Sequence, residues 1–156
     1  MAGIKPIKRS EQLAPLSRDH HDGLLFAWKI RQGLKNGSSP AAIMAYVHWY
    51  WTNHLQLHFS QEEHLLLTHL SESNEMAQRL KAEHQQVREL VSATPDTLLL
   101  SKLADIMTDH IRFEERQLFP YIEQTISKDQ LNTIHKQLDQ PSHCSEKWED
   151  EFWVKK

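Results

Sequence analysis

The chain has 156 residues, which is the size of one ordinary domain, and a formal net charge of −3. Charged residues make up 25% of the chain, with both signs mixed along it, so nothing favours binding to nucleic acid or to an anionic membrane. The single cysteine, Cys144, excludes a disulfide framework and a thiolate cluster for zinc. No segment approaches the roughly 18 apolar residues of a membrane span, and we expect a soluble, cytoplasmic protein.

The first half of the chain predicts two helices. Ser17 is a candidate N-cap for a helix that runs to about Lys35. Its apolar positions at near-helical spacing are Leu24, Leu25, Trp28 and Leu34. Ser39 followed by Pro40 combines a capping residue with a proline in the first turn, which predicts a second helix to about Leu70.

The second half predicts two more long helices. A polar run precedes a helix that we place at about 74–92. Thr94 and Pro95 repeat the cap-plus-proline signal and predict a fourth helix at about 95–126. Pro120 lies inside that helix and should bend it, because proline lacks one backbone donor and crowds the preceding turn.

A shorter fifth helix is predicted by the capping-box pattern Ser127-x-x-Gln130. No segment alternates like a strand, so the fold class is all-α. Four long helices with short connections favour an antiparallel up-down-up-down four-helix bundle with a short C-terminal helix. We treat the whole chain as one domain, with its core at about 13–126 and a short helix and tail at 127–156.

The tail after Pro141 has no clear pattern, although three aromatic residues lie among its charges. These residues are Trp148, Phe152 and Trp153. They can pack back on the bundle or join a second copy of the chain, and we favour the first interpretation.

The strongest signal of function is an internal repeat. His58, Glu62, Glu63 and Leu66 recur 52 residues later as His110, Glu114, Glu115 and Leu118. Residues four apart on an α-helix project from one face about one turn apart, so each histidine and the first glutamate after it can reach the same ion. Imidazole mixed with carboxylate suits iron or manganese, and burying such groups without a metal is costly.

Histidines on the other two long helices can complete such a site. The first helix contains His20 and His21, and the third contains His84. Eleven histidines in one helical chain also exceed what packing requires. Four histidines and two carboxylates that converge inside a bundle make a plausible dinuclear metal site.

Four motifs in these helices form a recognisable set. They are Leu16-x-x-x-His20, His58-Phe59-x-x-Glu62-Glu63, Glu83-His84, and His110-Ile111-x-x-Glu114-Glu115 followed by Leu118-Phe119-Pro120. The set spans about residues 13–125 and resembles the cation-binding motifs of hemerythrin-like domains. The resemblance implies two iron ions, bridged by oxygen as oxo or hydroxo. The implied ligands are His20, His58, Glu62, His84, His110 and Glu114, with both glutamates bridging.

One position departs from the oxygen-carrying hemerythrins, which have a further histidine four residues before the one that matches His84. Leu80 stands there and cannot bind a metal. An emptier coordination sphere then admits solvent, small anions or other gases more readily, which disfavours dedicated oxygen carriage. The alternatives that the residues leave open are His54 as an added donor, His21 in place of His20, and Glu115 in place of Glu114.

The resemblance favours a non-haem diiron protein that binds or reacts with a small molecule such as dioxygen, a reactive oxygen species or nitric oxide. An alternative is iron or oxygen sensing in a stress response, in which metal binding controls the fold and contact with a partner. A third possibility is an enzyme, but no motif supports a particular organic substrate.

Overall fold

The computed structural model describes residues 9–138 and 147–155, and within them every regular element is helical. The predicted all-α class is therefore confirmed. The helices are α1 (Ala14–Lys35), α2 (Pro40–Tyr50), η1 (Trp51–Leu55), α3 (Gln56–Gln61), η2 (Glu62–Leu66), η3 (Leu67–His69), α4 (Glu75–Ser92), α5 (Thr97–Phe113), η4 (Glu114–Leu118), α6 (Phe119–Thr125) and α7 (Lys128–Leu138).

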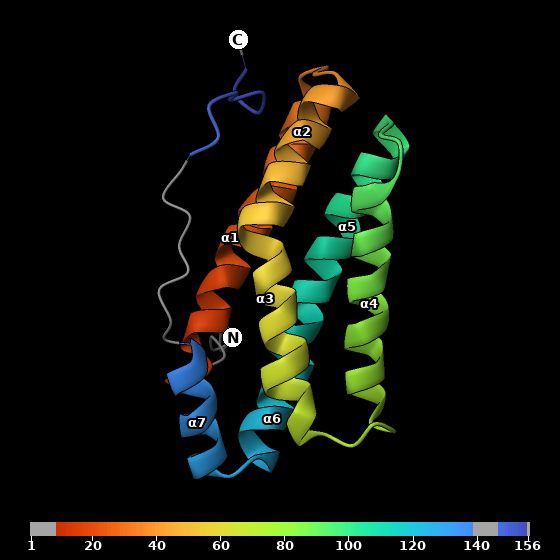
Figure 1. Cartoon of the computed structure of the whole chain (residues 1–156). Helices are drawn as coiled ribbons and strands as arrows, with labels where there is room; N and C mark the ends of the chain where they lie inside the picture. Colours follow the sequence, from red (N-terminus) through yellow and green to blue (C-terminus); the bar gives the residue numbers. More distant parts are fainter. Residues whose placement is uncertain (1–8, 139–146, 156) are drawn as a thin grey trace, which may run out of the picture.

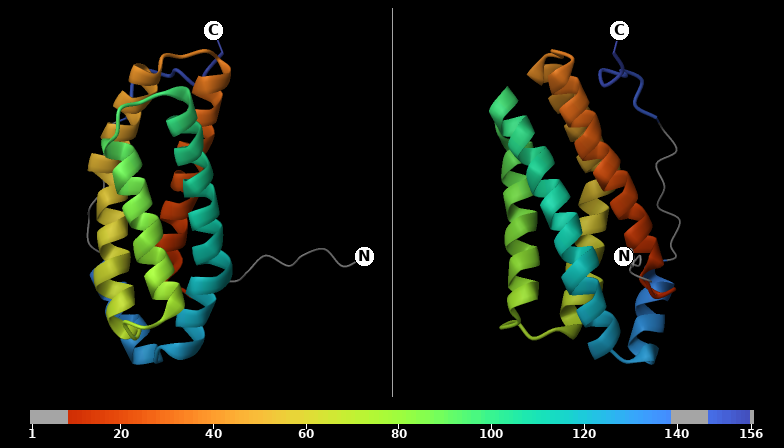
Figure 2. Two further views of the ribbon diagram at one scale, coloured as in Figure 1. Left: turned by 90° about the vertical axis from the view of Figure 1, so that its right-hand side faces the viewer. Right: turned by 180° about the vertical axis from the view of Figure 1, so that it is seen from behind.

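These segments form four long rods that lie side by side (Figures 1 and 2). The rods are α1, the unbroken run from α2 to η3, α4, and the run from α5 to α6. The short helix α7 follows α6 at one end of the bundle (Figure 1).

Two of the predicted helix starts agree with the structure. The Ser39 hydroxyl accepts a hydrogen bond from the backbone N–H of Ala42 at 3.1 Å, which caps α2. Before α7, the Gln130 N–H donates to the Ser127 hydroxyl and the Ser127 N–H donates to the Gln130 side chain, both at 3.2 Å. This reciprocal pair is the capping box that the sequence predicted.

The predicted start of the first helix was wrong. The helix α1 begins at Ala14, and Pro15 occupies its first turn, where a missing N–H costs nothing. Ser17 therefore lies inside the helix. Its hydroxyl donates to the Glu115 carboxylate at 2.9 Å and so links α1 to η4.

The predicted start of the fourth helix was also displaced. Asp96, rather than Thr94, is the N-cap of α5, because its carboxylate accepts a hydrogen bond from the Leu99 N–H at 2.7 Å. A carboxylate also interacts favourably with the positive end of the helix dipole. Pro95 therefore precedes the helix.

Both copies of the sequence repeat contain a wide, π-helical turn. The turns η2 and η4 begin at Glu62 and Glu114, respectively. Such turns are rare, and they frequently occur at functional sites. Pro120 lies in the first turn of α6, directly after η4. The π-helical turn η4 therefore interrupts the regular α-helix just before the proline that we predicted to bend it.

The apolar core consists of two clusters at different levels of the bundle. The first contains Phe26, Val87 and Ile111, and the second contains Leu16 and Leu80, among others. His20 and His84 each lie between a residue of the second cluster and a residue of the first along the same helix. The buried polar residues described below therefore have apolar packing on both sides.

The buried face of α1 differs from the one that its large apolar residues suggest. Leu24, Leu25 and Trp28 are 41%, 42% and 47% exposed, respectively. The face that packs inward includes Gly23, where an added Cβ atom would lie 2.8 Å from Cδ1 of Ile111 on α5. A residue without a side chain thus allows α1 and α5 to approach closely.

The described part of the tail packs against the bundle, as we predicted. The side chain of Phe152 is buried in the first cluster, and Trp148 and Trp153 pack against that cluster. The Asn36 side chain donates to the backbone carbonyl of Trp153 at 3.1 Å. Pro141 and Cys144 lie outside the described residues.

Candidate metal centre

The six residues that the resemblance selected come together in the middle of the bundle. Their exposed fractions lie between 0% and 6%. They are His20 from α1, His58 from α3, Glu62 from η2, His84 from α4, His110 from α5 and Glu114 from η4. Each of the four long rods therefore contributes at least one buried ligand-type side chain.

These residues form two groups that share both glutamates. One group is His20, His58, Glu62 and Glu114, and the other is His84, His110, Glu62 and Glu114. Within each group the potential ligand atoms all lie within 4.8 Å of one another. Each group thus has two histidines of its own and shares two carboxylates with the other. Such an arrangement could hold a pair of neighbouring cations.

The four imidazole rings have a common orientation, with Nε2 directed toward the shared carboxylates. His20 Nε2 is 3.2 Å from a Glu114 oxygen, His58 Nε2 is 3.3 Å and His84 Nε2 is 3.2 Å from Glu62 Oε1, and His110 Nε2 contacts Glu114 Oε1. All four histidines thus present the same ring nitrogen to the centre of the site.

The opposite ring nitrogen, Nδ1, lies next to a second set of carboxylates. The Nδ1–oxygen distances are 3.0 Å from His58 to Asp19, 2.8 Å from His110 to Glu83, 3.5 Å from His20 to Glu115 and 3.6 Å from His84 to Glu63. The two shorter contacts are hydrogen bonds, whereas Nδ1 of His20 and of His84 has no hydrogen-bond partner among the described residues. A carboxylate can only accept, so Asp19 and Glu83 favour a proton on Nδ1 and leave Nε2 for a metal.

Each of these four carboxylates directly precedes or follows, in the sequence, one of the six buried residues described above. We call those six the inner residues. Asp19 precedes His20 but contacts a histidine of α3, and Glu83 precedes His84 but contacts a histidine of α5. Glu63 and Glu115 follow the shared glutamates and contact histidines of α4 and α1. We call Asp19, Glu63, Glu83 and Glu115 the outer carboxylates. The sequence interpretation missed this set, and an acid directly beside each of four expected ligands was the available signal.

Basic side chains hold three of the outer carboxylates in place. Arg88 lies 2.6 Å from Glu63, Arg79 lies 2.9 Å from Glu83, and Arg9 lies 3.6 Å from Glu115. An ion pair of this kind keeps the carboxylate ionised and oriented toward its histidine. Burial opposes ionisation of Glu83, but contacts with His110 and Arg79 outweigh it and lower the pKa of that carboxyl.

Glu62 is ionised even though it is buried. Burial by itself raises the pKa of Glu62, but the charge of His58 and the bonds to His20 and His58 lower it well below its usual value. Burial likewise lowers the pKa of His20, yet the Glu115 and Glu62 carboxylates raise it to about 9. For His110 burial prevails, and its pKa is lowered despite the contact with Glu83. A proton on His20 therefore offsets part of the buried negative charge in the metal-free protein.

The inner atoms have the properties that a cation site requires. Within the described residues, Nε2 of His20, His58 and His110 and both carboxylate oxygens of Glu114 are buried without a hydrogen-bond partner. Leaving such atoms without a partner is costly, and a cation satisfies them together. Imidazole nitrogens and carboxylate oxygens without thiolates are a donor set for iron, manganese or zinc.

A family model described as the hemerythrin HHE cation binding domain matches residues 12–122. The chain belongs to this family. The matched range includes all six inner residues and all four outer carboxylates. Comparisons with curated proteins and with solved structures gave no match. Among the helices of the described residues, none has both the length and the apolar character that crossing a membrane needs.

The alternatives left open for this hemerythrin-like site occupy different places. His21 is exposed, whereas His20 is 4% exposed and belongs to the first group of potential ligands. Glu115 faces the Nδ1 side of His20, away from the shared carboxylates. His54 belongs to neither group, and its ring lies 5.3 Å from the rings of both Trp49 and Tyr50.

Two aromatic rings fix the orientation of the histidines. The Phe59 ring stacks on His84 with centroids 3.7 Å apart and an angle of 7°, and the Phe119 ring stacks on His20 at 5.2 Å. Stacking of this kind limits rotation of the imidazole ring. In the hemerythrin-like site, stacking therefore restrains His20 and His84, whereas hydrogen bonds to carboxylates restrain His58 and His110.

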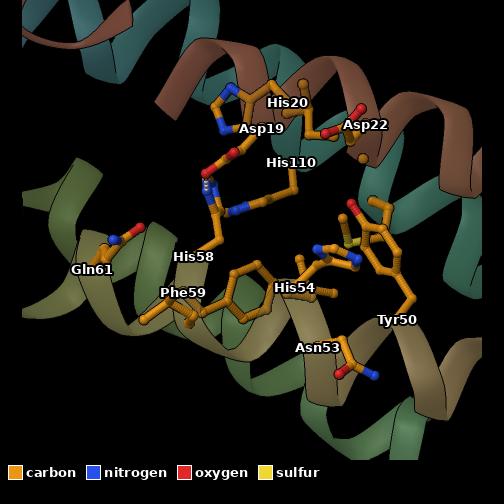
Figure 3. A pocket seen from close by; sticks show the side chains of 15 residues that line it. Asp19, His20, Asp22, Tyr50, Asn53, His54, His58, Phe59, Gln61 and His110 are labelled. Carbon is orange, nitrogen blue, oxygen red and sulfur yellow. Dashed lines mark hydrogen bonds and ion pairs between the residues drawn. The ribbon is translucent and has the colours of Figure 1, made fainter. Parts of the chain in front are cut away.

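A cavity of about 60 Å³ reaches the site from the side of the first apolar cluster. His20, His58 and His110 line its inner part. Figure 3 shows Tyr50 and His54 next to each other on the same helical run as His58. A volume of this size gives room for a small molecule beside the site. Leu80 is not among the described residues that line this cavity, and its side chain is fully buried in the second cluster.

The outer carboxylates lead to a prediction for metal affinity. Replacing Glu83 with glutamine should weaken metal binding by about 10- to 100-fold, because the Nδ1–H of His110 loses its charged acceptor. Metal titration followed by calorimetry measures the change. The matched control is Glu89→Gln on the same helix, where the glutamate is exposed and does not contact the site. Equal affinities for the two variants would show that the outer carboxylate has no such role.

Proposed function

We propose that the chain binds two iron ions in this site and that the bound iron receives a small molecule such as dioxygen, a reactive oxygen species or nitric oxide. The observation that supports this most strongly is the pair of residue groups that share Glu62 and Glu114. The proposed ligands are the six inner residues. The four helices that carry them are proposed to run in an antiparallel up-down-up-down order. The cytoplasmic location stays a prediction.

The inner residues have complementary roles in this proposal. The histidines would hold the ions through Nε2, and Glu62 and Glu114, which belong to both groups, would serve both ions. Two carboxylates also offset part of the positive charge that two ions bring into a buried site. Bound iron would supply an open coordination position and electrons for a small molecule.

The surroundings support the same chemistry. Asp19 and Glu83 bond to Nδ1 of His58 and His110 and orient these rings, so that Nε2 is available for binding. Apolar side chains of the two core clusters limit the entry of water, which protects a reactive small molecule from side reactions. The cavity beside His58 gives such a molecule a place next to the ions.

The test begins with protein purified without a histidine tag. Elemental analysis should find about two iron ions per chain after anaerobic loading with ferrous iron. Exposure to dioxygen should then produce ligand-to-metal charge-transfer absorption in the near-ultraviolet or visible range. The matched control is His48→Ala, which removes an exposed histidine outside the site. Two ions per chain without any new absorption would exclude reaction with dioxygen, and nitric oxide would then be tested in the same way.

A second candidate function is sensing, in which metal loading controls the stability of the fold and contact with a partner. It is supported by the origin of the six inner residues, which come from all four rods of the bundle. A metal held by separate helices couples binding to folding. Equal thermal midpoints for metal-free and iron-loaded protein would contradict this candidate.

A further inference from the structure

The cavity beside the site has one small inner end and one acidic outer end. Its inner end is formed by the three histidines named above and by apolar side chains that include Met107 and Ile111. Toward the surface, Asp19 and Asp22 of α1 line it together with polar residues of η1 and α3. Asp22 is exposed, and the Asp19 side chain is 46% exposed. No lysine or arginine is among the described residues that line the cavity.

The geometry of this cavity restricts what can reach the ions. Its volume of about 60 Å³ gives room for a small molecule next to the three histidines. Asp19 bonds to His58 and Lys29 interacts with Asp22, but the exposed Asp22 carboxylate still places negative charge at the outer end. This charge opposes the entry of anions. A neutral molecule of the same size does not meet this barrier.

We propose that this cavity receives the small molecule and that Asp19 and Asp22 make it selective for neutral molecules over small anions. The inference rests on the proposed function, because it takes for granted that metal ions occupy the neighbouring site. It adds the class of ligand: small neutral molecules.

Tyr50, on the same helical run as His58, provides a neutral polar group for such a molecule. Tyr50 and His54 lie next to each other in the cavity wall (Figure 3). Burial raises the pKa of the Tyr50 phenol, and the nearby Tyr46, Asp22 and Asp19 raise it further, so the group keeps its proton. A phenol can donate a hydrogen bond to a neutral ligand without adding charge to the cavity.

The decisive residue is Asp22, because it is exposed and forms none of the contacts to the histidines described above. In iron-loaded protein, Asp22→Asn should tighten azide binding by about three- to five-fold at low ionic strength, and Asp22→Lys should tighten it by about tenfold or more. The effect should shrink in high salt because the charges are then screened. Binding of nitric oxide, a neutral ligand, should stay within about a factor of two.

The matched control is Glu72→Gln, which removes one negative charge from an exposed loop at the other end of the bundle from the α1–α2 connection (Figure 1). Iron content is measured first by elemental analysis, and ligand dissociation constants follow by absorption and electron paramagnetic resonance. Azide affinity that is unchanged by both Asp22 substitutions, or changed equally by Glu72→Gln, would overturn the inference alone. Failure to load iron, or loaded iron that binds neither ligand, would instead contradict the proposed function.

Discussion

Replacing Glu62 with glutamine is expected to lower the metal content from about two ions per chain to well below one. The reason is that Glu62 belongs to both groups of potential ligands, so one substitution removes an anionic donor from each. The amide has nearly the same shape, but it is neutral and a much weaker ligand for iron. Elemental analysis of protein loaded under identical conditions measures the loss.

The symmetry of the site supplies an internal check on this result. Glu114→Gln should have the same effect, because Glu114 is the other shared carboxylate. Glu89→Gln should retain both ions, because Glu89 is exposed on α4. Circular dichroism of each variant verifies that the helices still form. Two tightly held ions in the Glu62→Gln protein would show that the glutamates are not shared ligands.

Removing the metal is expected to lower the thermal midpoint of unfolding by about 10–15 °C. A ligand present at about 1,000 times its dissociation constant stabilises the native state by about 4 kcal/mol, and each kcal/mol shifts the midpoint of a domain of this size by about 2–4 °C. The ligand-type residues come from four separate rods, so the unfolded chain offers no preformed site. Differential scanning calorimetry with and without a chelator measures the shift.

The same experiment has a pH dependence with a definite sign. In the metal-free protein the pKa of His20 is raised to about 9, so the folded state binds this proton more tightly than the unfolded state. The stabilisation is fully present below about pH 6.5 and is lost as the pH rises through 9. Metal-loaded protein should not show this loss, because the ion replaces the proton. The difference between the two midpoints should therefore grow from pH 6.5 to 9, and a constant difference would contradict the proposed balance of charges.

Four of the inner residues were marked in the sequence because they repeat at a spacing that places each pair on one helical face. His20 and His84 were added through the resemblance to the family. The starts of α2 and α7 were also predictable, since Ser39 and the Ser127–Gln130 pair make local hydrogen bonds that depend on no other helix. The outer carboxylates were missed for the opposite reason. Glu83, for example, faces a histidine on another helix, and that contact depends on how α4 and α5 are rotated.

The orientation of α1 could not be predicted from its large apolar residues. Its inward face contains Gly23 and Gly33, which carry no hydrophobic signal, whereas Leu24 and Trp28 face solvent. An added Cβ atom at Gly33 would lie 2.5 Å from the Phe152 ring, so the glycine marks a close approach to a segment distant in sequence. The position of the cavity was equally hidden, since the sequence drew attention to Leu80 and the open space lies at the other apolar cluster.

The outer carboxylates also bear on how the sequence specifies a single packing of its helices. Each one is adjacent in sequence to an inner residue but contacts a histidine on another helix. Sliding α4 by one residue would therefore displace His84 from the inner set and Glu83 from His110 at the same time. A misaligned bundle would bury several unmatched charges, which costs more than a shift in an apolar interface. The residues of the candidate metal site thus favour one register of the four helices over other arrangements of the bundle, even before any ion binds.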